Sequence, residues 1–294
     1  MLSPEEAVDR LRRAFGGPGG HRTLHAKGHF YSGSFTATPE AGRRSRATHL
    51  DGDTHPVLVR WSNAGGNADV PDTVPDIRGM AVKLRGADGE PFDLLGQTSP
   101  RFPTDDPQVF VELTEAATKP AKLPAFLLRH PRTAARMLST ARSGALAKHR
   151  SYAAPTYYPL HAYGWLDADD QLTWVRYELR PASAAPMAET FTGADRLEEE
   201  MATRLEHGPV TFELWARVAG QGDDPHRVTS EWRGEEELLV GRIEVTDQLP
   251  DPEADGSPTV FDPAREVDGI VLSDDPILRF RPSAYSESIA RRSS

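Results

Sequence analysis

The chain has 294 residues, of which 38% are hydrophobic and 27% are charged, as in an ordinary water-soluble globular protein. Its net charge of -10 argues against nucleic-acid binding, and the absence of cysteine excludes disulfides, thiolate metal sites and a catalytic cysteine. No stretch is apolar enough to span a bilayer, and the first residues do not read as a signal peptide. We therefore expect a cytoplasmic protein with neither a membrane nor a nucleic acid as partner.

The predicted elements begin with a helix, which Ser3 caps with Pro4 in its first turn and Glu6 completing a capping box. Gly16 and Gly17 are expected to end this helix. Strand-like segments separated by turn residues follow at residues 28–38, 57–62, 80–85 and 92–95.

The rest of the chain alternates in longer blocks. Helical patterns cover residues 105–117, 121–130, 131–143, 195–206 and 282–292. Further strand patterns cover residues 162–167, 172–180, 210–218 and 237–246. Strands in a meander with helical insertions predict an α+β fold, in which helices surround an antiparallel sheet or barrel. We find no linker, and we interpret residues 1–294 as a single domain with a surface loop at 251–258.

Nucleotide-binding glycine motifs, the zinc motif HExxH and the nucleophile motif GxSxG are all absent. Two segments stand out instead: residues 22–28 (RTLHAKG) and residues 275–285 (DPILRFRPSAY). Taken singly, His25 in the first could be a loop histidine, and Tyr285 in the second could be a packing residue of a helix.

Together, the two segments resemble the distal and proximal motifs of the haem catalases. Three further segments resemble catalase motifs in the same order: residues 60–62 (RWS), 76–83 (DIRGMAVK) and 92–96 (FDLLG). Because the chain is far shorter than a typical catalase, it is similar to the catalase-related peroxidase branch. The resemblance implies an antiparallel β-barrel of about eight strands with surrounding helices, and haem b buried beside the barrel.

On the proximal side, the resemblance makes Tyr285 the iron ligand. A phenol titrates near pH 10, so a phenolate at pH 7 needs a pKa lower by roughly three units, or about 4 kcal/mol. Ferric iron and a nearby cation can supply this. Arg281 lies four residues earlier and shares a face with Tyr285 if the helix has already begun. Otherwise Arg281 is a solvated charge.

On the distal side, the resemblance makes His25 the group that moves the peroxide proton, which suits a neutral imidazole. Ser62 is expected to bond the other ring nitrogen, although it could be an ordinary strand serine. Gln97 stands where the family has asparagine. Its longer side chain puts efficient dismutation of hydrogen peroxide in doubt, but matters less to a peroxidase cycle.

Haem propionates are anions that buried cations should meet. By motif position, Arg22, Arg60 and Arg292 are the candidates, with Arg291 as a substitute for Arg292, although each could be a surface arginine.

Phe110 and Phe102 match aromatic positions beside the family's distal pocket, and a core role is equally consistent with the sequence. His161 matches a histidine on the proximal side.

These residues predict a haem peroxidase that reduces hydrogen peroxide or organic hydroperoxides through a ferryl intermediate, using an organic electron donor. Weak catalase activity and a role in oxidative-stress defence go with this interpretation. The alternatives are a hydroperoxide isomerase like the allene oxide synthases, a non-catalytic haem-binding barrel, and a barrel without haem. The natural peroxide, the donor, NADPH binding and a homo-oligomeric state remain open.

Overall fold

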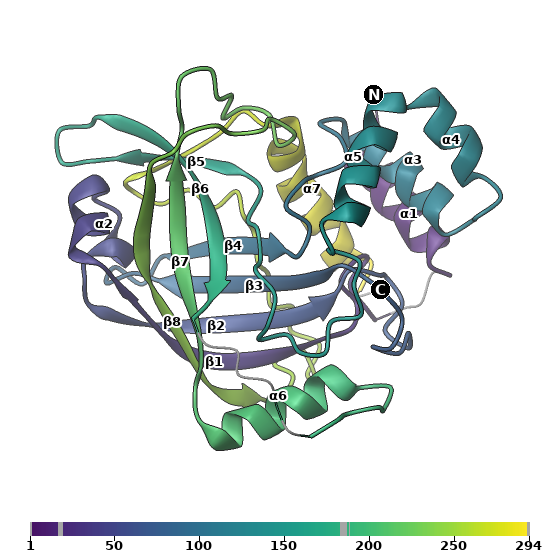
Figure 1. The fold of residues 1–294 in the computed structure, drawn as a ribbon, viewed down its shortest axis with the longest axis horizontal. Coiled ribbons are helices and arrows are strands. Elements are labelled where there is room, and N and C mark those ends of the chain that lie inside the picture. Colours follow the sequence, from purple (N-terminus) through teal and green to yellow (C-terminus); the bar gives the residue numbers. More distant parts are fainter. Residues whose placement is uncertain (1, 17–19, 183–186, 188, 293–294) are drawn as a thin grey trace.

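The computed structural model describes residues 2–16, 20–182, 187 and 189–292. Its centre is one curled antiparallel sheet with the strand order β4-β3-β2-β1-β8-β7-β6-β5-β9 (Figure 1). The strands are β1 (Gly28–Ala37), β2 (Thr54–Asn63), β3 (Arg78–Arg85), β4 (Pro91–Gln97), β5 (Ala162–Leu166), β6 (Leu172–Pro181), β7 (Val210–Val218), β8 (Glu237–Leu249) and β9 (Ile270–Leu272).

The helices of the described residues lie around this sheet. They are α1 (Pro4–Ala14), α2 (Pro39–Arg44), α3 (Pro107–Ala117), α4 (Leu123–Arg129), α5 (Pro131–Arg142), α6 (Arg196–His207) and α7 (Pro276–Ala290), with a 3-10 turn at Thr48–Leu50. The predicted cap of α1 is confirmed, because Ser3 Oγ accepts a hydrogen bond of 3.1 Å from the Glu6 amide. The helix ends at Ala14, and Gly17 lies outside the described residues.

The sheet curls far enough to enclose an aromatic core. Large buried side chains of its inner face include Tyr31, Trp61, Phe92, Tyr163 and Phe212. Residues 157 and 158 span the gap between the two halves of the curl, because Tyr158 bridges to Gln97 of β4 and Tyr157 bridges to Leu179 of β6. The expected α+β architecture of an antiparallel, barrel-like sheet with surrounding helices is confirmed.

Three features differ from the sequence expectation. The three-residue strand β9 and the six-residue helix α2 are too short to give a periodic signal, and neither was predicted. The last helix begins at Pro276 and not at Pro282, because Asp275 Oδ1 caps it by accepting a 2.8 Å bond from the Ile277 amide. Pro282 therefore lies inside α7.

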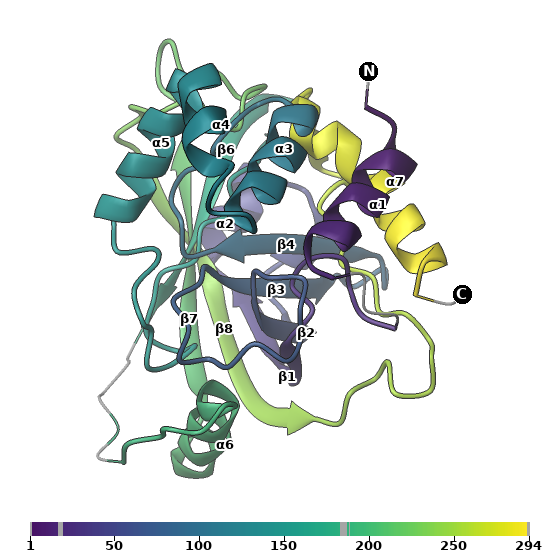
Figure 2. The same cartoon turned by 90° about the vertical axis from the view of Figure 1, so that its right-hand side faces the viewer.

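Helices α1 and α7 pack side by side, with α3 next to α1, on the β1–β4 side of the molecule (Figure 2). Helices α4 and α5 continue this layer outward, whereas α6 lies at a separate end of the sheet. Within the described ranges, no helix combines the length and hydropathy needed to cross a membrane.

Candidate haem and peroxide site

Three neighbouring strands form a row of aligned residues on the outer face of the sheet. Ser62 of β2 lies opposite Gly79 of β3, and Gly79 lies opposite Gln97 of β4. Directly opposed residues project from the same face, so the Ser62 and Gln97 side chains flank Gly79. Two strand spacings separate their backbones, about 10 Å.

The His25 ring lies over the bare backbone of Gly79. Its Nδ1 is 2.9 Å from Ser62 Oγ. A Cβ added to Gly79 would lie 2.7 Å from two ring atoms of His25 and 2.9 Å from Ser62 Oγ, closer than real contacts allow. Only glycine at this position therefore leaves room for the histidine–serine pair.

His25 adopts an unusual backbone conformation, with φ of 56° in the left-handed region. Two hydrogen bonds to the loop after β2 hold it there: the His25 amide donates to the Ala64 carbonyl at 3.1 Å, and the Ala26 amide donates to the Gly65 carbonyl at 3.0 Å. Such conformations persist only where the surroundings fix them, and they concentrate at functional sites.

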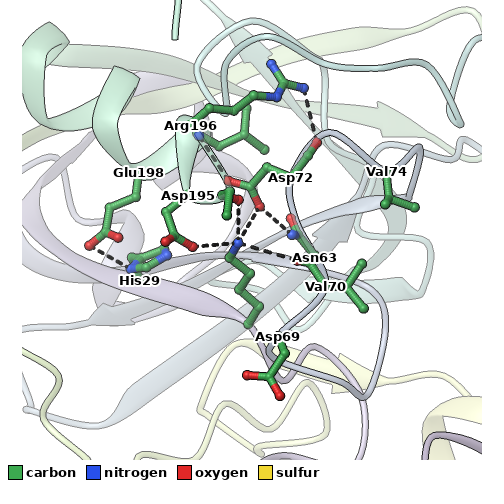
Figure 3. A network of polar contacts seen from close by, with 12 residues as sticks. His29, Asn63, Asp69, Val70, Asp72, Val74, Asp195, Arg196 and Glu198 are labelled. Carbon is green, nitrogen blue, oxygen red and sulfur yellow. Dashed lines mark hydrogen bonds and ion pairs between the residues drawn. The ribbon is translucent and has the colours of Figure 1, made fainter. Parts of the chain in front are cut away.

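A buried polar network anchors the same segment from the other side (Figure 3). The Lys27 ammonium lies 3.1 Å from Asp72 Oδ1 and 2.7 Å from Asp195 Oδ1. Asp72, which is fully buried, also accepts bonds of 2.7 Å from Asn63 Nδ2 and 3.0 Å from the Leu197 amide. Because Asn63 follows Ser62 and Lys27 lies two residues after His25, this network fixes both partners of the pair.

Burial and the positive field of Arg60, Arg281 and Arg22 lower the pKa of His25 to about 3. The imidazole is therefore neutral over the physiological range. A neutral imidazole can accept a proton on one nitrogen while the other is held by a hydrogen bond.

Arg22, Arg60 and Arg292 converge on one cavity of about 200 Å³. Glu253 lies there too, accepting bonds on Oε1 of 2.8 Å from Arg22 and 3.0 Å from Arg292. The Nε atoms of the three arginines are buried without a partner. A cluster of one buried and two largely buried cations, with one carboxylate and unsatisfied donors, fits a ligand that carries further carboxylates, as haem does. The Arg60 pKa is lowered to about 9, mainly by burial.

Tyr285 and Arg281 both lie on α7, four residues apart and on one face, as expected. Burial raises the pKa of Tyr285, and the Arg281 charge acts in the opposite direction. Arg281 and Arg22 act electrostatically on both Tyr285 and His25, which supports a shared site for residues from the two ends of the chain.

A contact between His161 and Asp275 fixes the start of α7. His161 Nδ1 lies 2.8 Å from Asp275 Oδ2, and both side chains are buried. Burial, the largest cause, and then the Arg281 charge lower the pKa of His161 to about 4. Further along the helix, Ser288 Oγ lies 2.9 Å from Thr23 Oγ1, which ties the helix to the segment that carries His25.

Three residues that were predicted for the haem and peroxide site contact other groups of the protein. Arg291 does not replace Arg292: it pairs with Asp9 at 3.0 Å and so ties α7 to α1. Phe110 stacks on Phe102 with ring centroids 5.1 Å apart, within a small apolar cluster. The Gln97 amide donates a 3.4 Å bond to the Ser99 carbonyl of its own chain segment.

Residues 20–294 match the family model described as Catalase, so the chain belongs to the catalase family of peroxide-acting haem enzymes. It is 39% identical to a catalase-related peroxidase of Mycolicibacterium paratuberculosis over 99% of this chain and 95% of the relative. A catalase-related peroxidase of Synechococcus elongatus is 28% identical over 99% of this chain and 89% of the relative. A solved bacterial catalase shares the fold, with a TM-score of 0.80 and 20% identity, covering 99% of this chain and 61% of that one.

Sequence reasoning missed three residues of the site. Gly79 lies in a motif that was read only as a resemblance, although a glycine inside a strand signals a close approach. Asp72 gives no local signal, because its partners Lys27 and Leu197 are distant in sequence. Glu253 lies within the segment 251–258, which was expected to be a surface loop, but its carboxylate is largely buried against Arg22 and Arg292.

Proposed function

We propose that this protein is a haem b peroxidase that reduces hydrogen peroxide or organic hydroperoxides at the expense of an organic electron donor. The observation that carries the proposal is the neutral His25 ring, bonded to Ser62 and seated over Gly79. A buried neutral base next to a cluster of arginines suits the cleavage of a peroxide bond, which needs one proton moved between two oxygens.

In the proposed reaction, His25 accepts the proton from one oxygen of the peroxide. It then returns this proton to the other oxygen, which leaves when the O–O bond breaks. Ser62 accepts a hydrogen bond from Nδ1–H, which leaves Nε2 free to take the proton. Bound haem would supply the two electrons that cleave the O–O bond, and an external donor would make up for them. The leaving oxygen departs as water or, from an organic hydroperoxide, as an alcohol.

On the opposite side, Tyr285 would bind iron as the phenolate, with Arg281 stabilising its negative charge. Arg22, Arg60 and Arg292 would bind the propionates. This arrangement uses the unpartnered Nε atoms of all three arginines.

Gln97 favours peroxidase over catalase activity. Its amide bonds the Ser99 carbonyl, so it is already engaged within its own chain segment. This bond directs the amide toward Ser99 and uses one of its two N–H donors, so a peroxide above Gly79 would find it less available, whereas the His25–Ser62 pair needed for O–O cleavage is kept. A site that keeps O–O cleavage but has a less available amide donor suits a peroxidase, whose cycle ends when an external donor supplies electrons.

The test combines an optical spectrum with product analysis. Purified, haem-loaded protein should show a high-spin ferric spectrum with a tyrosinate signature, which Tyr285→Phe abolishes. Hydroperoxide should be consumed together with an added donor such as a phenol, and His25→Ala should slow this about 100-fold or more. Rapid oxygen evolution without donor oxidation would contradict the proposal, and rearranged lipid product without donor consumption would favour the isomerase.

A further inference from the structure

Residues 116–166 contain no aspartate or glutamate, although the chain has 44 of them. The cations of this stretch are Lys119, Lys122, Arg129, Arg132, Arg136, Arg142, Lys148 and Arg150. All are exposed except Arg136, which is half-buried. The molecule as a whole is acidic, but helices α4 and α5 carry Arg129, Arg132, Arg136 and Arg142 and no acidic residue.

Helices α4 and α5 also expose leucines. Leu128 of α4 is 84% exposed and Leu138 of α5 is 51% exposed. The inner sides of both helices pack on Phe126 and its neighbours, so these leucines are not part of the core. On α5, the exposed residues Leu138 and Arg142 lie four residues apart, which places a leucine and an arginine on one helix face.

A cavity of about 480 Å³ opens between α3 and the α4–α5 junction, lined by Arg129, Arg132 and Arg136. Its two acidic residues are already engaged, because Asp105 pairs with Arg227 at 3.1 Å and Asp106 caps α3. Arg136 donates a 3.0 Å bond to Thr229 Oγ1, a neutral group. The cavity therefore presents positive charge that is not neutralised by its own lining.

We propose that the outer surface of α4 and α5, here called the α4–α5 surface, docks on an anionic phospholipid bilayer. The arginines would bind lipid phosphates, with the cavity accepting a head group, and Leu128 and Leu138 would enter the interface. A soluble polyanion would satisfy the arginines but give the leucines nothing to bury against. This departs from the expectation that no membrane is a partner, which rested on the lack of an apolar stretch long enough to span a bilayer.

Vesicle co-sedimentation tests the proposal without reference to peroxidase activity, so either proposal can fail alone. The full-length protein should bind phosphatidylglycerol–phosphatidylcholine vesicles but not pure phosphatidylcholine, and added salt should weaken binding. Each arginine near an anionic surface is worth about fivefold in partitioning, so Arg129→Glu with Arg132→Glu should lower binding about 25-fold or more. Leu128→Ser with Leu138→Ser should lower it about tenfold or more.

Matched controls come from the opposite end of the sheet. Arg85→Glu, at the end of β3, reverses one arginine and is compared with Arg129→Glu alone, and Leu172→Ser removes a leucine that is 48% exposed and is compared with Leu138→Ser alone. Both should bind vesicles like the parent protein. The proposal is overturned if the parent protein does not bind anionic vesicles, or if the controls lose as much binding as the α4–α5 variants. It is also overturned if the leucine variants instead abolish self-association in light scattering while vesicle binding persists.

Discussion

The two sides of the candidate site are built differently. On the sheet side, strand register sets the positions of Ser62, Gly79 and Gln97, and His25 lies over the glycine. On the helix side, Tyr285 depends on a single helix, α7, that is held by ties at its two ends. Backbone pairing thus defines one side, and individual side-chain contacts define the other.

This difference indicates how each side can fail. The sheet side tolerates little change in side-chain volume, because neighbouring strands cannot move apart without breaking the hydrogen bonds between them. The helix side tolerates changes of volume better, but it depends on charged and polar anchors that can be removed one at a time.

The largest effect is expected from Gly79→Ala, which adds a methyl group where His25 and Ser62 leave no space. The displaced imidazole should lose its role in proton transfer, lowering the rate of reaction with hydroperoxide about 100-fold to 10,000-fold. Stopped-flow measurement on haem-loaded protein checks this. Gly65→Ala is the matched control, since its new Cβ would approach only Asp76 Oδ2, at 3.8 Å. Equal rates for the two variants would show that the aligned residues Ser62, Gly79 and Gln97 do not position His25.

On the helix side, Asp275→Ala should remove both the cap of α7 and the partner of buried His161. The two losses together should lower the free energy of unfolding by about 3 kcal/mol. Asp106→Ala, which removes the cap of α3 and no buried partner, should cost about 1 kcal/mol. Urea unfolding measures both, and similar costs would mean that the His161 pair adds nothing to the anchoring of α7.

A third comparison separates the two arginines that directly follow α7, Arg291 and Arg292. Arg292→Gln should weaken haem binding to apoprotein about 10-fold to 100-fold, because a charge-assisted bond to a propionate is lost. Arg291→Gln should leave haem affinity unchanged, because this residue pairs with Asp9 of α1. Spectroscopic titration with haem distinguishes them, and the opposite ranking would exclude Arg292 as a propionate ligand.

The smallest effect concerns acidity. The pKa of His25 is lowered to about 3 and that of His161 to about 4, so the unfolded chain binds more protons than the folded one below pH 6.5. Stability should fall as the pH drops, by about 1.4 kcal/mol per histidine at pH 5.5 relative to pH 7. Urea unfolding of apoprotein at the two pH values checks this, and His161→Gln should remove one part of the difference.

Much of the fold could be predicted from the sequence, since long strands and helices carry periodic patterns. The structure confirms the antiparallel sheet and its surrounding helices. The start of α7 was placed too late, because Pro282 was taken as a first-turn proline when Asp275 and Pro276 already begin the helix. Short elements such as β9 depend on tertiary pairing alone and give no local signal.

For the site, motif resemblance identified the side chains with chemistry but not their supports. His25, Ser62 and Tyr285 were proposed because they lie in segments that resemble catalase motifs. Gly79 matters through the space it leaves, and Asp72 through partners from three separate segments, so neither could be found before the strands were aligned. Whole-chain charge also concealed the basic α4–α5 surface, because an average cannot show how charge is distributed.

The tie between Thr23 and Ser288 has a consequence for synthesis. Helix α7 must leave the ribosome before it can reach the segment that carries His25. A polypeptide that emerges from its N-terminal side can pair β1 with β2 early, but it cannot complete the pocket until α7 is free. Cofactor capture is therefore expected only once α7 has emerged, by a chain whose sheet has already folded.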